Sequence, residues 1–151
     1  MITYQEELFG EMVEEMKPHL DQHYAETETY QDKVPLNPDY DAYQIMEDLG
    51  VLNVFTARDD GELIGYGITF MNMSPHSKEH LFATNDIIYV QKEYRHTEVA
   101  PELISGIENI MQQNDVSILT FHMKAHKPFE SLLDSLGFDN IESVYSKYIG
   151  K

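Results

Sequence analysis

Cysteine is absent from the 151 residues, which excludes disulfides, thiolate metal sites and cysteine nucleophiles. The chain also lacks an apolar run of about 18 residues and the basic and apolar segments of a signal peptide, so we expect no transmembrane helix and an intracellular location. Lysine and arginine number only 10 against 27 acidic residues, a net charge of −17. Because phosphate contacts need basic side chains, nucleic-acid binding is not expected.

Acidic residues are concentrated in the first third of the chain. Residues 1–50 hold thirteen acids against two lysines, a net charge of −11, whereas residues 51–151 hold fourteen acids against eight bases, a net charge of −6. Such a field favours a cationic partner, such as an amine, a polyamine or a basic protein. Two other interpretations stay open: exposed acids that keep the protein soluble, and an acidic surface that mimics DNA.

Apolar residues make up 42% of the chain, enough for one domain with its own core. Apolar side chains at helical spacing predict an amphipathic helix over about residues 5–24, with Pro18 inside it. A second helix is expected to start after Asp39 or Asp41 and to stop at Gly50.

Strand and turn signals alternate in the middle of the chain. Two β-rich runs, 52–58 and 63–71, are joined by an Asp-Gly turn at 59–62, which predicts an antiparallel hairpin. A polar loop over 72–79 is expected to lead into a strand at 81–90. The remaining elements are expected to be a helix at 101–113, a strand at 116–123, a short helix stopped by Gly137, and a final strand at 141–149.

These elements predict one α+β domain over residues 1–151, an α/β three-layer arrangement in which helices flank a mixed β-sheet. The segment from Asp86 through the helix to 116–123 is a strand–helix–strand crossover, so its two strands should be parallel. A short polar loop opens on Arg95 and ends at Pro101, a favourable first residue of a helix. Orphan N–H groups and the helix dipole suit such a loop to an anion.

This layout resembles the acyl-CoA pyrophosphate loop of the GNAT acetyltransferases, whose pattern is Arg/Gln-x-x-Gly-x-Gly/Ala. Here Arg95 opens the loop, Glu98 replaces the first glycine and Ala100 stands at the second. The order of elements is similar to the GNAT fold over nearly the whole chain. The hairpin stretch Phe55–Gly67 and the segment 125–138 resemble two further motifs of the family.

The nearest resemblance is to GNAT-like proteins of tailed phages and bacteria, carried by Tyr30–Leu36 and by the approximate match of His122–Ala125. The resemblance implies acetyl-CoA held where the two parallel strands part, with its pyrophosphate on the loop. The cofactor-binding residues that it implies are Val90, Arg95, His96, Thr97, Glu98, Val99, Ala100 and Lys124.

Glu98 is the main departure from the family pattern, because it adds bulk and a negative charge beside the expected diphosphate. Like charges a few ångströms apart cost on the order of 1–4 kcal/mol. Three lysines, together with Arg95, are expected near that end of the strands and would offset it: Lys92, Lys124 and Lys127.

Asp86 is the candidate catalytic base, since a desolvated carboxylate has a raised pKa and can take a proton from an ammonium group. The alternative is an aspartate at the strand end that is hydrogen-bonded to the backbone.

The family's tyrosine acid corresponds to Leu133, so His122 is the candidate to donate a proton or contact CoA. The alternative for His122 is a histidine satisfied by backbone groups. Tyrosines near the first two helices, including Tyr43, either line an acceptor pocket or belong to the core.

Two histidine pairs are spaced four residues apart, His19 with His23 and His76 with His80. His19 and His23 would need further ligands to bind zinc. The spacing of His76 and His80 suits a metal only on a helix, and Pro75 favours a loop there, so no metal is expected.

The first functional hypothesis is an acetyl-CoA-dependent N-acetyltransferase acting on an amine of a small molecule or protein. The alternative is a catalytically inactive GNAT-fold protein, encoded by a phage, that acts through protein–protein contacts. The expected partners are an amine substrate or a basic protein, with no membrane and no nucleic acid, and the chain is expected to be a monomer or homodimer. Its expected location is the cytoplasm. If the gene is a phage gene, the expected location is the host cytoplasm or the virion.

Overall fold

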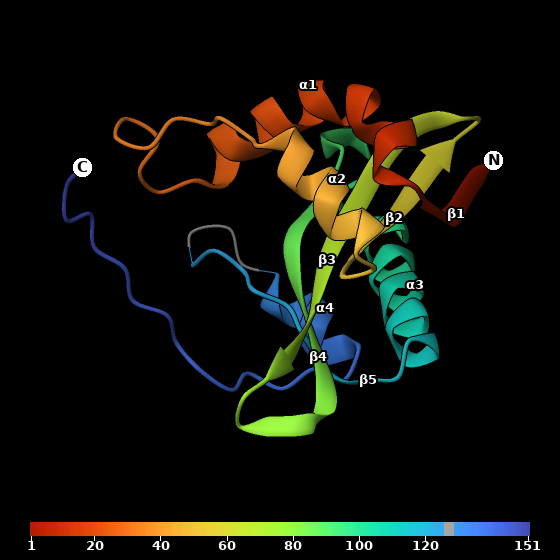
Figure 1. The fold of residues 1–151 in the computed structure, drawn as a ribbon. Helices are drawn as coiled ribbons and strands as arrows, with labels where there is room; N and C mark the ends of the chain where they lie inside the picture. Colours follow the sequence, from red (N-terminus) through yellow and green to blue (C-terminus); the bar gives the residue numbers. More distant parts are fainter. Residues whose placement is uncertain (126–128) are drawn as a thin grey trace.

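The computed structural model describes residues 1–125 and 129–151, and it is built around a five-stranded sheet in the order β1-β2-β3-β4-β5. Neighbouring strands are antiparallel except β4 and β5, whose parallel pairing confirms the predicted crossover (Figure 1). The described elements are β1 (Ile2–Glu7), α1 (Phe9–Thr27), α2 (Tyr40–Asp48), β2 (Leu52–Asp59), β3 (Glu62–Ser74), β4 (Ser77–Val90), the 3₁₀ turn η1 (Lys92–Tyr94), α3 (Val99–Gln113), β5 (Val116–Thr120) and α4 (Glu130–Ser135).

The predicted hairpin is confirmed in β2 and β3. The two strands pair from Leu52 opposite Phe70 to Asp59 opposite Glu62. In the turn between them, Asp60 and Gly61 have φ angles of 47° and 90°. Positive φ at both central residues is what the tight turns of two-residue hairpins require, so the Asp-Gly pair sets the register of the sheet centre.

The N-terminal strand corrects the sequence prediction, which began a helix at about residue 5. Residues 2–7 form β1, antiparallel to β2, and α1 begins only at Phe9. Ile2 and Tyr4 pack against the core while Thr3 between them is exposed. This two-residue period is typical of a strand. The sequence prediction missed this strand because it is short. Glu6 and Glu7 at its end fit the acidic first turn of a helix equally well.

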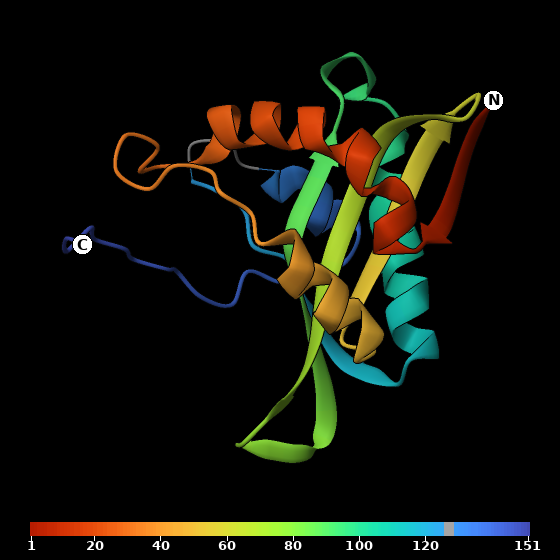
Figure 2. The same cartoon turned by 45° about the horizontal axis from the view of Figure 1, so that its top comes forward.

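Helices cover both faces of the sheet (Figure 2). α1 and α2 share one core cluster with the sheet, and α3 shares the other. α3 approaches its face closely: a Cβ added to Gly106 would lie 2.1 Å from the ring of Phe55, and one added to Gly67 would lie 2.5 Å from Ile107. A side chain at Gly106 would collide with the Phe55 ring, and one at Gly67 would displace the end of the Ile107 side chain, so both glycines let α3 lie close to the sheet.

Smaller features of the helices match the sequence. The Asp39 side chain accepts a hydrogen bond from the N–H of Ala42 (3.0 Å), which confirms it as the N-cap of α2. Gly50, just beyond that helix, has a φ of 76°. α3 begins at Val99, two residues before the predicted start, so Pro101 lies in its first turn.

The predicted polar loop over 72–79 is wrong. β3 continues to Ser74 and β4 starts at Ser77, with Met73 opposite Leu81, so the strands form a ribbon that extends past the body of the domain (Figures 1 and 2). The residues are polar because both faces of the ribbon tip are largely exposed to solvent, and this polarity is why the sequence pattern indicated a loop.

The predicted final strand at 141–149 is also wrong, since the structure has neither helix nor strand there. Its apolar side chains are exposed, with 73% of Ile141 and 93% of Tyr145 accessible. β-rich composition favours a strand only where a neighbouring strand pairs with it. β5 likewise ends at Thr120 rather than Met123.

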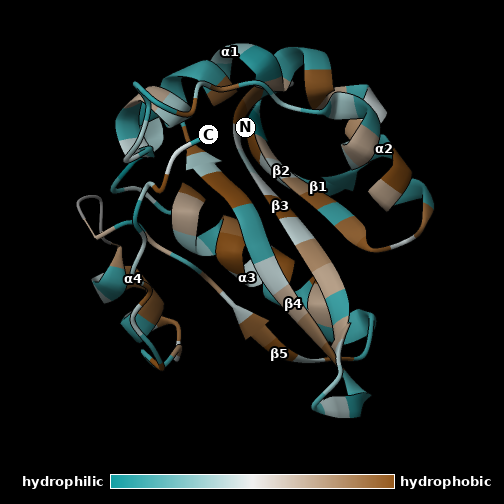
Figure 3. Cartoon of the chain, turned by 60° about the vertical axis from the view of Figure 1, so that its left-hand side comes forward, coloured by the Kyte–Doolittle hydropathy of each residue, from teal (hydrophilic) through white to brown (hydrophobic). Residues whose placement is uncertain are grey.

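Within the described residues, no helix is long and apolar enough to cross a membrane. In Figure 3 most of the α1 ribbon has the colour of hydrophilic residues.

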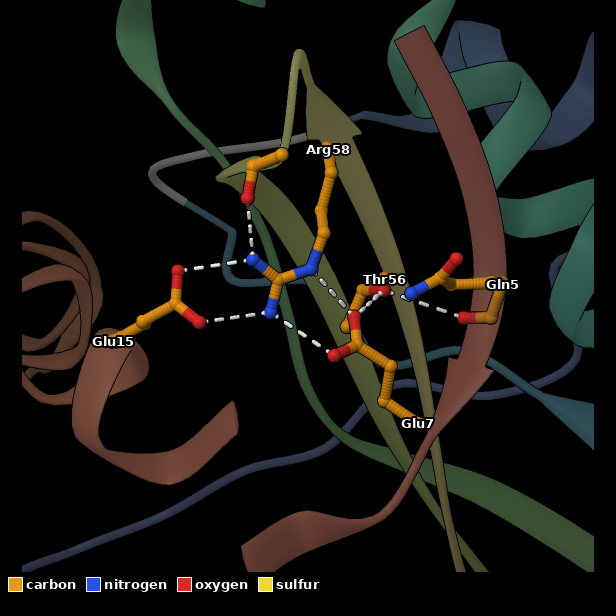
Figure 4. Close-up of polar contacts among 6 residues, drawn as sticks. Gln5, Glu7, Glu15, Thr56 and Arg58 are labelled. Carbon is orange, nitrogen blue, oxygen red and sulfur yellow. Dashed lines mark hydrogen bonds and ion pairs between the residues drawn. The ribbon is translucent and has the colours of Figure 1, made fainter. Parts of the chain in front are cut away.

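Arg58 on β2 joins three parts of the fold (Figure 4). Its guanidinium donates to Glu7 at the end of β1 (2.8 Å from Nε), to Glu15 on α1 (2.9 Å) and to the carbonyl of Gly61 in the hairpin turn (2.7 Å). Thr56 donates a further hydrogen bond to Glu7. Only 12% of the Arg58 side chain and 10% of the Glu7 side chain are exposed, so this is a largely buried ion pair.

Replacing Arg58 by methionine should lower the free energy of unfolding by about 3–5 kcal/mol, because Glu7 would keep a buried charge without its partner. Urea denaturation of Arg58→Met measures the loss. Lys17→Met is the matched control, since Lys17 pairs with Glu14 on the surface (side chains 41% and 79% exposed) and such pairs contribute about 0–1 kcal/mol. Equal losses in the two variants would contradict the role assigned to Arg58.

The same cluster predicts acid sensitivity. Burial alone would raise the pKa of Glu7, but hydrogen bonds from Arg58 and Thr56 outweigh it, so the pKa is lowered. The unfolded chain therefore binds this proton at a higher pH than the folded one. The stabilisation is present above the ordinary glutamate pKa of about 4.3 and is lost as pH falls through the lowered value. We expect the melting midpoint to fall more steeply between about pH 5 and pH 3 in the wild type than in Glu7→Gln. Parallel curves would disprove the coupling.

Candidate functional site

β4 and β5 separate halfway along β4. Their last register pair is Thr84 opposite Thr120, although β4 continues to Val90 and stays paired with β3 along its other edge. In the part of the chain that the structure describes, no strand pairs with the β5-facing side of residues 85–90. We call this stretch the open edge of β4. Its existence agrees with the parting of strands that the sequence resemblance implied.

Asn85 closes the paired part of the two strands. Its side-chain Oδ1 accepts a hydrogen bond from the N–H of His122 (2.6 Å), and its Nδ2 donates to the carbonyl of the same residue (3.4 Å). The amide thus satisfies both backbone groups of His122 just beyond the end of β5. The sequence interpretation missed Asn85, because a lone polar residue in a strand gives no sign of its partner.

Asp86 lies in a β-bulge at the start of the open edge. Ile68 of β3 faces Ile87 and Thr69 faces Asn85, so Asp86 is the extra residue of β4. Bulges re-aim the side chain of the extra residue and are frequent next to active sites. The predicted base is therefore placed by a break in strand register where β5 departs.

Tyr43 of α2 is the one described side chain bonded to the Asp86 carboxylate, donating from its hydroxyl to Oδ2 at 2.5 Å. The Tyr43 ring is stacked on Phe9 of α1, with 5.3 Å between ring centroids. Burial of the carboxyl raises the pKa of Asp86, and the hydrogen bond from Tyr43 opposes the rise by stabilising the anion. The residue as a whole is exposed, so the carboxyl is only partly desolvated and solvent can still reach it.

The loop from Arg95 to Glu98 carries the chain from β4 into α3. Thr97 Oγ1 donates to the carbonyl of Tyr94 and accepts from the N–H of Val99 (3.3 Å), which fixes the turn. Among the residues described, no protein acceptor bonds the N–H groups of Thr97, Glu98 and Ala100. Unpaired N–H groups at a helix N-terminus are suited to an anion.

Glu98 fits this loop without backbone strain. Its φ of −74° and ψ of −8° are ordinary right-handed values, whereas the left-handed residue of the loop is His96, with φ of 64°. After burial, the charges of Glu102 and Glu98 are the next causes that raise the pKa of Tyr4 on β1. The Glu98 carboxylate therefore acts toward the β1 side of α3 as well as on the loop.

Two of the four predicted cations, Arg95 and Lys124, are paired with acids at the end of α1. Arg95 forms an ion pair with Glu26 (2.8 Å) and donates from Nε to the carbonyl of Val90 (2.8 Å). Lys124 lies beyond β5 and pairs with Glu28 at 3.4 Å. Lys92 is exposed in η1. Lys127 lies outside the described residues.

His23 lies among these charges and was not singled out from the sequence as part of the site. Burial lowers its pKa, and four charges act on it: Glu26 and Glu28 raise the pKa, whereas Arg95 and Lys124 lower it. The last turns of α1 therefore contact residues that follow both β4 and β5. His122 has an exposed side chain beside the open edge, and Leu133 is half-buried on α4.

Comparisons with known proteins agree with this geometry. The sequence profile described as the acetyltransferase (GNAT) family matches residues 14–138. No curated protein sequence matches significantly.

Several solved structures are similar over the full length. A ribosomal-protein-alanine N-acetyltransferase from Brucella melitensis biovar Abortus 2308 is 19% identical, with a TM-score of 0.71, covering 99% of this chain and 100% of that one. A glucosamine-6-phosphate N-acetyltransferase from Arabidopsis thaliana is 10% identical, with a TM-score of 0.76, covering 99% of both chains. A predicted acetyltransferase from Clostridium acetobutylicum with acetyl-CoA is 9% identical, with a TM-score of 0.73, covering 99% and 97%. At these identities the likeness shows the fold alone.

Proposed function

Because the chain belongs to the acetyltransferase (GNAT) family, we propose that it transfers an acetyl group from acetyl-CoA to an amine. The observation that carries the proposal is the open edge of β4, which ends at a helix N-terminus with unpaired N–H groups. An extended ligand that carries a diphosphate at one end needs both features: a strand edge that offers backbone hydrogen bonds, and an anion site beyond it.

The loop would hold the diphosphate mainly through backbone N–H groups. Thr97, Glu98 and Ala100 supply those groups, and His96 gives the loop its turn. Arg95 acts as the anchor of the loop, because it is held by Glu26 and the Val90 carbonyl.

Lys124 is the cation that the ligand would recruit. Its pair with Glu28 is half-exposed (side chains 45% and 35%), and such a pair costs about 0–1 kcal/mol to exchange. Val90 and Val99 are buried at the two ends of the loop and would shape its approach to the strand.

Bound acetyl-CoA would supply the acetyl group as an activated thioester. The chain's own contribution is proton transfer at Asp86, which lies at the start of the open edge with a raised pKa. An ammonium group must lose a proton before its nitrogen can attack a carbonyl carbon, and a carboxylate more basic than usual accepts that proton more readily. The neighbouring His122 would donate a proton to the departing group, in place of the tyrosine that Leu133 replaces.

A cationic acceptor fits the charge of the protein. The net charge is −17, and the acids of residues 1–50 dominate it. A field of this sign raises the local concentration of amines and basic peptides and repels polyanions. We propose a small polyamine or a lysine-containing protein as the acceptor.

Acetyl-CoA should raise the melting midpoint, because a ligand that binds only the folded state stabilises it. At a concentration one hundred times Kd the gain is about 2.7 kcal/mol, or roughly 5–10 °C for a chain of this size. Acetyl-pantetheine, which lacks the diphosphate, is the matched ligand and should stabilise far less. A midpoint that neither compound moves would remove the transferase proposal and favour the inactive scaffold.

Glu98 should weaken the binding of acetyl-CoA through its charge. Glu98→Gln should tighten Kd about fivefold, since a charge repulsion of about 1 kcal/mol is removed. Glu98→Gly should tighten it further if the side chain also obstructs the diphosphate. Isothermal titration measures both, with Glu102→Gln, one turn along α3, as the control. Unchanged affinity in both Glu98 variants would mean that the diphosphate does not lie on this loop.

A further inference from the structure

Asp86 has two carboxylate oxygens in different situations. Oδ2 accepts the Tyr43 hydroxyl at 2.5 Å, whereas Oδ1 has no partner among the described residues. A bulge residue has less support from its strand than its neighbours, because it lacks a register partner on β3. The contact with Tyr43 is therefore what limits rotation of this carboxylate.

Tyr43 is itself rigidly placed. Its ring packs between Phe9, at 5.3 Å, and Phe70 of β3, at 6.1 Å. The helix that carries it is capped by Asp39 and tied to α1 by Glu47, whose Oε2 accepts the N–H of Phe9 at 2.7 Å. Two aromatic contacts and a capped helix therefore hold the Tyr43 ring in place. They fix the position of the hydroxyl that donates to Asp86.

We propose that Tyr43 is a positioning residue, whose hydroxyl fixes Oδ2 of Asp86 and leaves Oδ1 to take the proton from the acceptor amine at the open edge. This inference rests on the proposed function. In the step, an N–H bond of the ammonium group breaks and its electron pair stays on nitrogen. An O–H bond forms at Oδ1, which makes Asp86 neutral.

The hydrogen bond also decides when the base is charged. The titratable groups that face the carboxyl are Tyr43 from α2 and Tyr66 from β3. Both phenols have raised pKa values, for which burial is the first cause, so both are neutral at neutral pH and only Tyr43 donates to Asp86. Because that donation stabilises the carboxylate, its removal must raise the pKa of Asp86 further.

Carbon-13 NMR of aspartate carboxyls measures this directly, with Asp86→Asn to assign the signal. In Tyr43→Phe, which keeps the ring and its stacking, the pKa of Asp86 should rise by about one unit relative to the wild type. The control is Tyr40→Phe: Tyr40 lies on the same helix and stacks on Phe9 at 6.5 Å, but its hydroxyl does not bond Asp86. That variant should leave the titration unchanged.

A kinetic readout accompanies the titration. The acid limb of acetyl transfer to spermidine, followed as thiol release, should move up in pH by the same amount in Tyr43→Phe and stay in place in Tyr40→Phe. An unchanged Asp86 titration in Tyr43→Phe, or equal shifts in both variants, overturns the inference while leaving the proposed function standing. A shifted titration without transfer by the wild type at any pH overturns the proposed function and the positioning role with it.

Discussion

The pairing between β4 and β5 is the constraint on which the rest of the site depends. β4 stays paired with β3 as far as Val90, yet β5 leaves it after Thr84. Parallel strands need a crossover, and α3 supplies it from the end of β4. In the part of the chain that the structure describes, this arrangement leaves the edge of β4 beyond Thr84 without a partner strand and places the N-terminus of α3 after its end. Because Gly67 and Gly106 carry no side chains, that helix can lie close to the sheet.

Acidic residues of the first third have a structural task that the charge count alone does not reveal. Glu7 and Glu15 bind Arg58, and Glu26 and Glu28 bind the cations that follow β4 and β5. The interpretation of the acids as solvated groups is therefore incomplete, because several of them hold β1, α1 and the two ends of the open edge in place. The remaining surface acids still give the protein its overall negative field.

The sequence predicted the parts of the fold that local chemistry determines. The Asp-Gly turn required positive φ, and the crossover required a parallel pair; both are confirmed. β1 was hidden because a strand at a sheet edge is defined by its partner, and 141–149 was assigned a strand because its composition fits one. At the candidate site, Asp86 and Arg95 were proposed from their place along the chain. Tyr43 was named only as a residue of an acceptor pocket or of the core. Its bond to Asp86 was not predicted, because a contact across 43 residues arises only in the folded protein.

Glu98 affects the loop through its charge and not through its backbone conformation. A glycine replaced at a left-handed position would strain the backbone, but Glu98 has a right-handed φ of −74°, and His96 takes the left-handed place with φ of 64°. Glu98 therefore causes no backbone strain, and its effect on the loop comes from its side chain. The N–H groups around it stay without protein acceptors in the described chain, so the helix terminus keeps its attraction for an anion. In the proposed site, affinity for a diphosphate would reflect two opposed contributions in the same turn, a favourable backbone dipole and an unfavourable carboxylate. The Glu98 charge also raises the pKa of Tyr4, so the same carboxylate acts on β1 as well as on the loop.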